Sequence, residues 1–256
     1  MNPKRSRPGP VIAAALLGAA AIAAAFYFKP LPAMEDKALL RSDAAVSVSS
    51  ETVGLLFSPA AADLAVAKAT GLIVYCAERV PPEAYAYLAR ACASAGYRAV
   101  LAAMPLNFPI LAPSRAAAVA AAFPAVSRWV IAGFSQGGAA AASFAASNGA
   151  SRAPVALAGI ILYAASPGRG VDLSTKSLPV VTVGATLDAI NPPARIAAGR
   201  DRLPAGSRYV EISGGNHAQF GECGPQPGDG LAEIPGPTQR RAVVDEALAL
   251  LAGVEK

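Results

Sequence analysis

The sequence predicts an α/β protein whose core is an open, mostly parallel sheet covered by helices on both faces. Short apolar runs alternate along the chain with helix-like segments, and Gly or Pro separates them. One run, GLIVYC at 71–76, is apolar throughout, which is typical of a central parallel strand. The stretch 127–148 (SRWVIAGFSQGGAAAASFAASN) combines an apolar strand, a sharp glycine-rich turn and a small-residue helix.

Each expected strand is a short run of β-branched or apolar residues that ends at a turn-forming residue. The first two runs lie at 46–50 and 52–57, and Ser58-Pro59 ends the second. Further strands are expected at 71–76, 97–103, 129–132, 155–163, 178–183 and 208–212.

Helices are expected between the parallel strands, because parallel neighbours need a crossover connection. The segment 81–95 has proline at its first turn and Gly96 as its stop signal. The other helices are expected at 113–122, 138–147, 193–202 and 237–252.

Residues 1–29 read as a membrane anchor or signal segment, residues 30–43 as a linker, and residues 44–256 as one large domain. The run 11–28 carries no charge, and at ~1.5 Å per residue it covers ~27 Å, enough to span a hydrocarbon core. Basic residues before the run predict a cytoplasmic N-terminus, with the domain outside the cytoplasm. We expect a single-pass membrane helix; the alternative is a signal peptide cleaved near 23–25 (AAA), which would release a secreted protein.

The net charge of +5 does not indicate a nucleic-acid partner. Lys4, Arg5, Arg7 and Lys29 flank the apolar run, and without them the 22 basic residues fall to 18, against 17 acidic ones. No run of basic residues with interleaved aromatics remains to bind phosphates. The three cysteines show no CxxC spacing, so the sequence implies no zinc site.

Ser135 is the candidate nucleophile, because it stands at the centre of Gly-Phe-Ser-Gln-Gly between an expected strand and an expected helix. Such a turn strains the backbone and exposes the serine Oγ, and the residues two positions away must lack side chains. Both are glycine here, Gly133 and Gly137. The following helix N-terminus favours a developing oxyanion.

A serine hydroxyl needs a base to take its proton, and a carboxylate to orient that base. His217 is the one histidine of the chain, and it follows the strand at 208–212. Asp188 follows the strand at 178–183 and is the expected acid, although it could instead cap the next helix. Asp172 and Asp201 are the alternatives. The carboxyl ends of parallel strands share one edge of a sheet, so we expect Ser135, Asp188 and His217 to meet there.

An oxyanion hole needs two backbone donors near the nucleophile. One is expected from the N–H of Gln136, directly after the serine. The other is expected from the loop after Tyr75, with Ala77 as its donor.

These motifs resemble the serine α/β-hydrolases, in particular a bacterial membrane-anchored branch near the dienelactone-hydrolase and esterase-like group. The resemblance covers about residues 45–253. It rests on IVYC…YAYLARACASAGY, MPLN at 104–107, GFSQGG at 133–138 and GGNHAQFG at 214–221, which runs into GPQPGDG. It implies that nucleophile, acid and base are Ser135, Asp188 and His217. The chain departs from the branch after the tyrosine strand, where Cys76-Ala77-Glu78 replaces Pro-Gly-Gly, and a serine nucleophile differs from the cysteine of dienelactone hydrolases proper.

Cys76 follows the strand that leads into the oxyanion loop, and Cys223 follows the expected catalytic histidine. In an oxidising compartment we expect a disulfide between them; the alternative is two separately buried thiols. Cys92 is expected in the core.

The sequence thus predicts a hydrolase that cleaves an ester or related acyl bond of a small molecule through an acyl-enzyme, with no metal or organic cofactor. The alternative is a catalytically silent member of the same fold that binds a ligand at the cell envelope, and Glu78 beside the oxyanion loop favours it. The triad leaves amide cleavage or acyl transfer open. The segments 104–109 and 221–237 are the expected walls of the substrate pocket.

Overall fold

The computed structural model describes residues 29–33, 36–60, 67–150 and 154–255, together with the isolated positions 14 and 17–19. The chain divides into two units, Met1–Pro30 and Leu31–Lys256. No helix among the described residues is both long and apolar enough to cross a membrane. The expected membrane helix at 11–28 lies almost wholly outside the described residues and stays a prediction.

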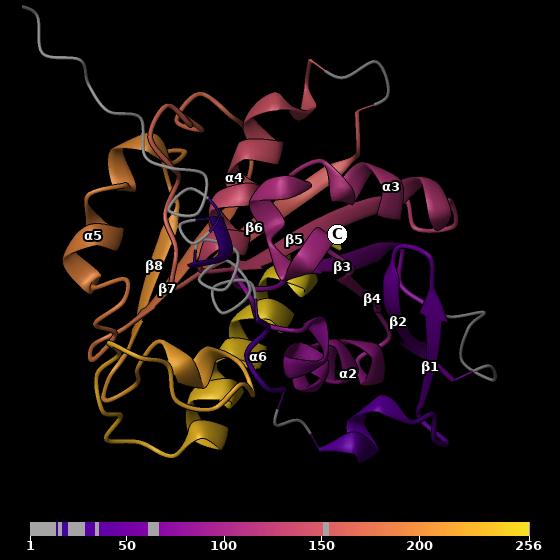
Figure 1. Ribbon diagram of the computed structural model, residues 1–256. Helices are drawn as coiled ribbons and strands as arrows, with labels where there is room; N and C mark the ends of the chain where they lie inside the picture. The colour runs from indigo at the N-terminus through magenta and orange to yellow at the C-terminus, as the bar shows by residue number, and fades with distance from the viewer. Residues whose placement is uncertain are drawn as a thin grey trace, which may run out of the picture. The chain divides into compact units, whose positions relative to one another are not determined.

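The second unit is built on an eight-stranded sheet in the order β1-β2-β4-β3-β5-β6-β7-β8 (Figure 1). The antiparallel pairs are β1–β2 and β2–β4, and all later pairs are parallel. The strands are β1 (Val46–Glu51), β2 (Gly54–Pro59), β3 (Thr70–Tyr75), β4 (Arg98–Ala102), β5 (Arg128–Phe134), β6 (Leu157–Tyr163), β7 (Val180–Ala185) and β8 (Arg208–Ile212).

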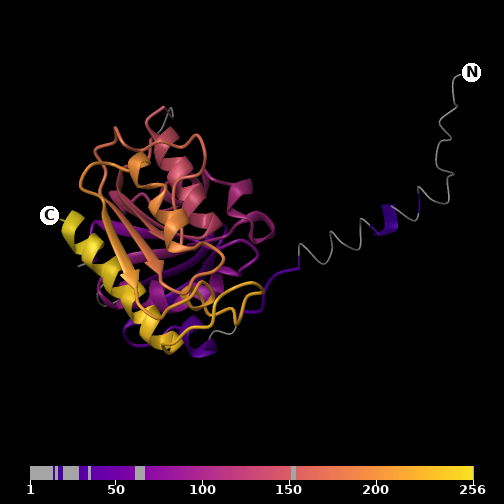
Figure 2. The ribbon, with the colours of Figure 1, turned by 90° about the vertical axis from the view of Figure 1, so that its left-hand side faces the viewer.

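Helices cover the sheet on both faces, as the alternating sequence pattern predicts. One face carries α2 (Ala86–Ser94) and α6 (Gly236–Val254), which also contact each other. The other carries α3 (Arg115–Ala122), α4 (Gln136–Asn148) and α5 (Pro193–Ala197). Figure 2 shows α6, in yellow, lying along the sheet. Short 3-10 turns complete the fold at Lys37–Leu40, Pro82–Tyr85, Pro105–Asn107, Pro109–Leu111, Arg200–Arg202 and Ala218–Phe220.

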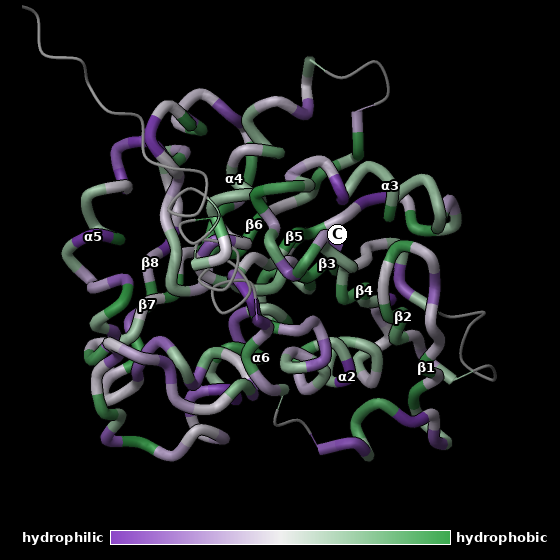
Figure 3. The backbone as a smooth tube through the Cα atoms, viewed as in Figure 1, coloured by the Kyte–Doolittle hydropathy of each residue, from purple (hydrophilic) through white to green (hydrophobic). Residues whose placement is uncertain are grey.

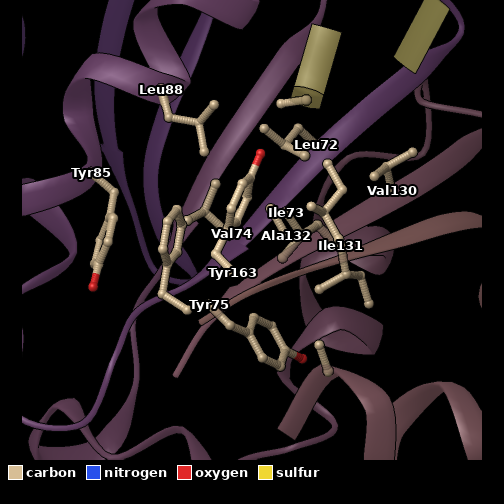
Figure 4. Close-up of a cluster of buried hydrophobic side chains, with 14 of the residues drawn as sticks. Leu72, Ile73, Val74, Tyr75, Tyr85, Leu88, Val130, Ile131, Ala132 and Tyr163 are labelled. Carbon is tan, nitrogen blue, oxygen red and sulfur yellow. The ribbon is translucent and has the colours of Figure 1, made fainter. Parts of the chain in front are cut away.

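The central strands are hydrophobic because both of their faces are covered. Every residue of β3 is buried, and all of β5 except Arg128 is buried. The hydropathy colouring in Figure 3 shows the same apolar centre. Leu72 and Val74 pack there with Leu88 of α2 and the ring of Tyr163 (Figure 4).

Several expected elements differ from the structure by a few residues in their bounds, and two of these differences have a clear local cause. The second strand begins at Gly54 rather than Thr52, because residues 52 and 53 form the hairpin turn from β1. The helix expected at 193–202 is divided: α5 ends at Ala197 and a 3-10 turn follows at Arg200–Arg202. Gly199 lies between them, where a Cβ would stand 2.7 Å from the Cβ of Ser166.

The strand order creates a crevice at the carboxyl ends of β3 and β5. The chain leaves β3 toward α2 on one face and leaves β5 toward α4 on the other. Loops that diverge in this way leave a space above the sheet, where ligands of open α/β sheets bind. Cys76-Ala77-Glu78 follows β3, and Ser135 follows β5.

Candidate active site

Ser135 lies on a strained turn between β5 and α4. Its φ of 51° and ψ of −118° lie outside the conformations that residues with a Cβ usually adopt. The neighbouring glycines make the turn possible: a Cβ on Gly133 would stand 2.5 Å from the Gly137 carbonyl oxygen. A Cβ on Gly137 would stand 2.2 Å from the Cys76 carbonyl oxygen. The Ser135 N–H donates to the Tyr163 carbonyl at 2.9 Å, which fixes the turn to β6.

Asp188 and His217 form a buried pair at the same edge of the sheet. The Asp188 Oδ2 and the His217 Nδ1 are 2.8 Å apart, and their side chains are 0% and 4% exposed. The other carboxylate oxygen of Asp188 accepts from the N–H groups of Ile190 at 3.0 Å and Asn191 at 2.6 Å. Asp188 therefore caps its own loop and also holds the Nδ1 of the imidazole ring. The Nε2 of the ring is left for another partner.

Neither alternative acid takes this place. Asp172 accepts from the Ser174 N–H at 2.8 Å, and Asp201 is exposed at the start of the 3-10 turn after α5.

The candidate nucleophile and the candidate base meet at one small cavity. Ser135 and His217 both line it, together with Ala77, Tyr85 and Phe220 among others. Its volume is about 10 Å³, room for a single water molecule. The hydrogen bonds found among the described residues do not include one between the Ser135 hydroxyl and His217.

The expected oxyanion donors differ in their environment. Gln136 is the first residue of α4, and its N–H belongs to the unpaired first turn of that helix. The Ala77 N–H instead donates to the Tyr85 hydroxyl at 3.1 Å. The Ala77 N–H is therefore already paired in this structure.

Tyr85 is held firmly in this position. It is 2% exposed, and its ring stacks on Phe134 with centroids 4.2 Å apart. Burial raises the pKa of the Tyr85 hydroxyl well above its ordinary value, and the nearby thiols of Cys223 and Cys76 raise it further. The hydroxyl is therefore protonated at neutral pH.

A side-chain contact joins the two loops of the crevice. The Gln136 Nε2 donates to the Glu78 Oε2 at 2.8 Å. The Gln136 side chain thus links the start of α4 to the loop after β3, a role that its sequence position alone did not indicate.

The expected disulfide is absent from the structure. Cys76, Cys92 and Cys223 are all free and buried. The Cys223 sulfur is 3.4 Å from the Gln226 Nε2, and both Cys76 and Cys223 lie near Tyr85. Burial raises the pKa of Cys76 to about 12 and also raises that of Cys223. The prediction of a Cys76–Cys223 bridge is wrong for this structure, because the two thiols occupy separate buried positions around the tyrosine.

Comparison with known proteins agrees with the geometry. The model of the Alpha/beta hydrolase family matches residues 71–241, more than half of the chain. The chain belongs to the Alpha/beta hydrolase family. A search of curated protein sequences finds no match to this α/β-hydrolase.

Solved structures of the same fold include three hydrolase relatives. A thermophilic esterase from Thermogutta terrifontis, bound to malate, is 13% identical with a TM-score of 0.55, over 82% of this chain and 99% of that one. The carboxylesterase CesB of Bacillus subtilis is 12% identical with a TM-score of 0.52, over 84% and 94%. An α/β serine hydrolase homologue from Coxiella burnetii is 17% identical with a TM-score of 0.53, over 80% and 98%. At these identities the likeness shows the fold alone.

Asp229 connects the loops that carry Asp188 and His217 in this α/β-hydrolase, and sequence reasoning missed it. Its carboxylate accepts from the N–H groups of His217 at 3.2 Å, Ala218 at 2.8 Å and Ala189 at 3.3 Å. It therefore joins the residue after Asp188 to His217. The signal available was its place in the GPQPGDG string after the histidine motif.

Gln239 of α6 supports the histidine from the opposite side. Its side chain is fully buried; it accepts from the Asn216 N–H at 3.0 Å and donates to the Asn216 carbonyl at 2.7 Å. The backbone immediately before His217 is thereby fixed to a long helix.

Ser135 also lines a larger hollow. A second hollow of about 640 Å³ is lined by Ser135, Gln136, residues 165–169 and residues from Ile190 to Arg202. The expected walls at 104–109 and 221–237 do not line it; only Gly221 and Gln226 of those segments reach the small cavity. A third hollow of about 490 Å³ in the loop 216–232 includes neither Ser135 nor His217.

Proposed function

We propose that this α/β-hydrolase cleaves an ester or related acyl bond of a small molecule, with Ser135 as nucleophile, His217 as base and Asp188 as the residue that orients the base. The observation that carries the proposal is the buried Asp188–His217 contact of 2.8 Å at the cavity that His217 shares with Ser135. The names of three solved relatives, two esterases and a serine hydrolase homologue, agree with it.

The proposed reaction has two steps that use the same residues. In the first, the Ser135 oxygen attacks the substrate carbonyl while the free imidazole nitrogen takes its proton and passes it to the leaving alcohol. In the second, the imidazole takes a proton from water, the resulting hydroxide attacks the acyl-enzyme, and the proton returns to Ser135. The cavity between Ser135 and His217 has room for one water molecule, where the second step needs it.

We further propose that the Tyr85 hydroxyl binds the oxyanion together with the Gln136 N–H. The Tyr85 oxygen accepts from the Ala77 N–H at 3.1 Å, so its own proton remains available for donation. The residue lines the same cavity as Ser135 and His217. In this arrangement Ala77 positions the tyrosine and contacts the substrate only through it.

A fluorophosphonate probe tests the nucleophile directly, because it forms a stable bond with an activated serine. We expect labelling of the wild-type protein and none of Ser135→Ala. Ser143→Ala is the matched control, since Ser143 lies in α4 and lines neither cavity of Ser135, so its loss should leave labelling intact. Hydrolysis of p-nitrophenyl butyrate should follow the same pattern. A labelled Ser135→Ala protein would contradict the proposal.

The second candidate is a silent binding protein with the same pocket. The hydrogen bond from the Ala77 N–H to the Tyr85 hydroxyl favours this function, because it leaves that N–H unavailable as a direct backbone donor to an oxyanion. The same probe separates the two functions. A wild-type protein that is not labelled but still binds a small ligand would support the function as a binding protein.

A further inference from the structure

Three arginines line the large hollow beside Ser135. Arg169 lies in the loop after β6, Arg195 in α5, and Arg202 in the 3-10 turn that follows α5. No Asp or Glu is among the residues that line this hollow. Its wall therefore has a charge of three positive units.

This charge is not neutralised by ion pairs. Among the described residues, the arginines that pair with carboxylates are Arg90, Arg208 and Arg240, none of which lines the hollow. Asp172 acts electrostatically on Arg202, but its carboxylate is exposed, accepts from the Ser174 amide and does not line the hollow. The guanidinium groups thus remain available to an anion.

Two of the arginines are held in place by backbone carbonyls. The Arg195 Nη1 donates to the Ile190 carbonyl at 3.2 Å, and the Arg202 Nη2 donates to the Pro167 carbonyl at 2.9 Å. A carbonyl positions a guanidinium without cancelling its charge.

The sizes of the two cavities decide where a substrate lies. Ser135 lines both, and the one that it shares with His217 has a volume of about 10 Å³. The hollow with the three arginines has about 640 Å³, which is in the range of small-molecule sites. The larger parts of a substrate whose carbonyl reaches Ser135 therefore have room beside the arginines.

We propose that the substrate of this enzyme carries an anionic group, a carboxylate or a phosphate, which the arginines bind while the ester carbonyl reaches Ser135. The inference rests on the proposed function and specifies its substrate class. Guanidinium groups suit it because their planar donors match carboxylate and phosphate oxygens in pairs.

The turnover experiment compares two esters that differ in one charge. Monomethyl adipate and methyl hexanoate have acyl chains of equal length, but the first ends in a carboxylate; hydrolysis is followed in a pH-stat. We expect kcat/KM to favour the anionic ester by about ten- to a hundredfold, the worth of one hydrogen-bonded charge pair. Arg195→Gln and Arg169→Gln should each reduce this ratio, and both together should bring it near one. Arg202→Gln is included with a melting curve, because it also frees the Pro167 carbonyl.

Arg241→Gln is the matched control. Arg241 is exposed on α6, on the other face of the sheet from α5, and its loss changes the net charge by the same amount. The substrate ratio should not change in this variant. A ratio that falls equally in Arg241→Gln would show that only the overall charge matters, which would overturn the inference.

Calorimetry with Ser135→Ala provides a readout without turnover. Glutarate and glycerol phosphate are titrated separately, so that the two arms distinguish a carboxylate site from a phosphate site. Binding that is lost in Ser135→Ala/Arg195→Gln supports the inference even if no ester is hydrolysed, in which case the proposed function alone fails. Hydrolysis of methyl hexanoate with no preference for the anionic ester, and no binding of either anion, would overturn the inference and leave the proposed function standing.

Discussion

Replacing Tyr85 with phenylalanine removes one oxygen atom from the cavity that Ser135 and His217 share. The ring stays, and with it the stacking on Phe134 at 4.2 Å, so the fold around α4 should persist. What is lost is the acceptor of the Ala77 N–H and the proposed donor to the oxyanion. The change therefore separates the chemistry of the hydroxyl from the packing of the ring.

The two losses have different magnitudes. Leaving the buried Ala77 N–H without an acceptor should cost about 1–3 kcal/mol of unfolding free energy. Removing one of two oxyanion donors should lower kcat by about 10²- to 10³-fold. The donor acts on charge that develops in the transition state, so KM should change little. Steady-state kinetics with p-nitrophenyl butyrate measure the catalytic effect, and urea unfolding measures the cost in stability.

Tyr87→Phe is the control for lost hydrogen bonding alone. Its hydroxyl donates to the Phe220 carbonyl at 2.8 Å and does not line the cavity of Ser135. This variant should lose comparable stability and keep its kcat. If Tyr85→Phe left kcat unchanged, the hydroxyl would only support the loop. If it raised kcat, the hydroxyl would be blocking the Ala77 donor, and the proposed oxyanion role would be refuted.

Three further changes test other parts of the site. Asp188→Asn should lower kcat by about 10³- to 10⁴-fold with a nearly unchanged melting temperature, because the amide leaves the His217 imidazolium without its buried counter-charge; activity within tenfold of wild type would count against the triad. Gly137→Ala should cost about 3 kcal/mol in urea unfolding and abolish labelling of the nucleophile, since its Cβ would meet the Cys76 carbonyl oxygen at 2.2 Å. Burial raises the pKa of the Glu255 carboxylate, but hydrogen bonds from two amides at the start of β3 outweigh the effect of burial, so that the pKa is lowered overall. Its stabilisation is thus present above its ordinary pKa of about 4.3 and lost as the pH falls through the lower folded value, and Glu255→Gln should flatten the stability curve between about pH 5 and 3.

The sequence was sufficient to predict the strands and the edge of the sheet at which Ser135, Asp188 and His217 come together. Hydrophobic runs such as the one from Gly71 to Tyr75 are set by local composition, so their positions agree with the structure within a residue or two. The Gly-x-Ser-x-Gly turn is equally local, because its strain is met by glycines within two residues of Ser135. Asp188 and His217 were found by one rule of topology, that polar residues just after parallel strands converge.

The remaining features depend on contacts between distant segments, which no local pattern encodes. The hydroxyl of Tyr85 reaches Ala77 only because the chain turns back after β3, and the expectation of a free Ala77 donor could not include it. Asp229 acts across the loops that carry Ala189 and His217. The disulfide prediction failed for a related reason: Cys76 follows β3 and its expected partner lies in the loop after β8, but side-chain packing around the tyrosine decides whether two sulfurs can meet.

The structure also divides the work of the site between two sets of loops. The loops after β3, β5 and β8 supply the proposed oxyanion donors, nucleophile and base, and they enclose a cavity with room for one water molecule. The loop after β6 and the helical turns after β7 supply the arginines and line the hollow of about 640 Å³. Substitutions in the first set should therefore act on kcat for every ester, because they change groups that contact the reacting atoms. Substitutions in the second set should act on the ratio of kcat/KM between anionic and neutral esters, because they change contacts that only one of the two substrates makes. A variant of Arg195 that lowered kcat equally for both esters would show that the two sets of loops are coupled, and the division would have to be abandoned.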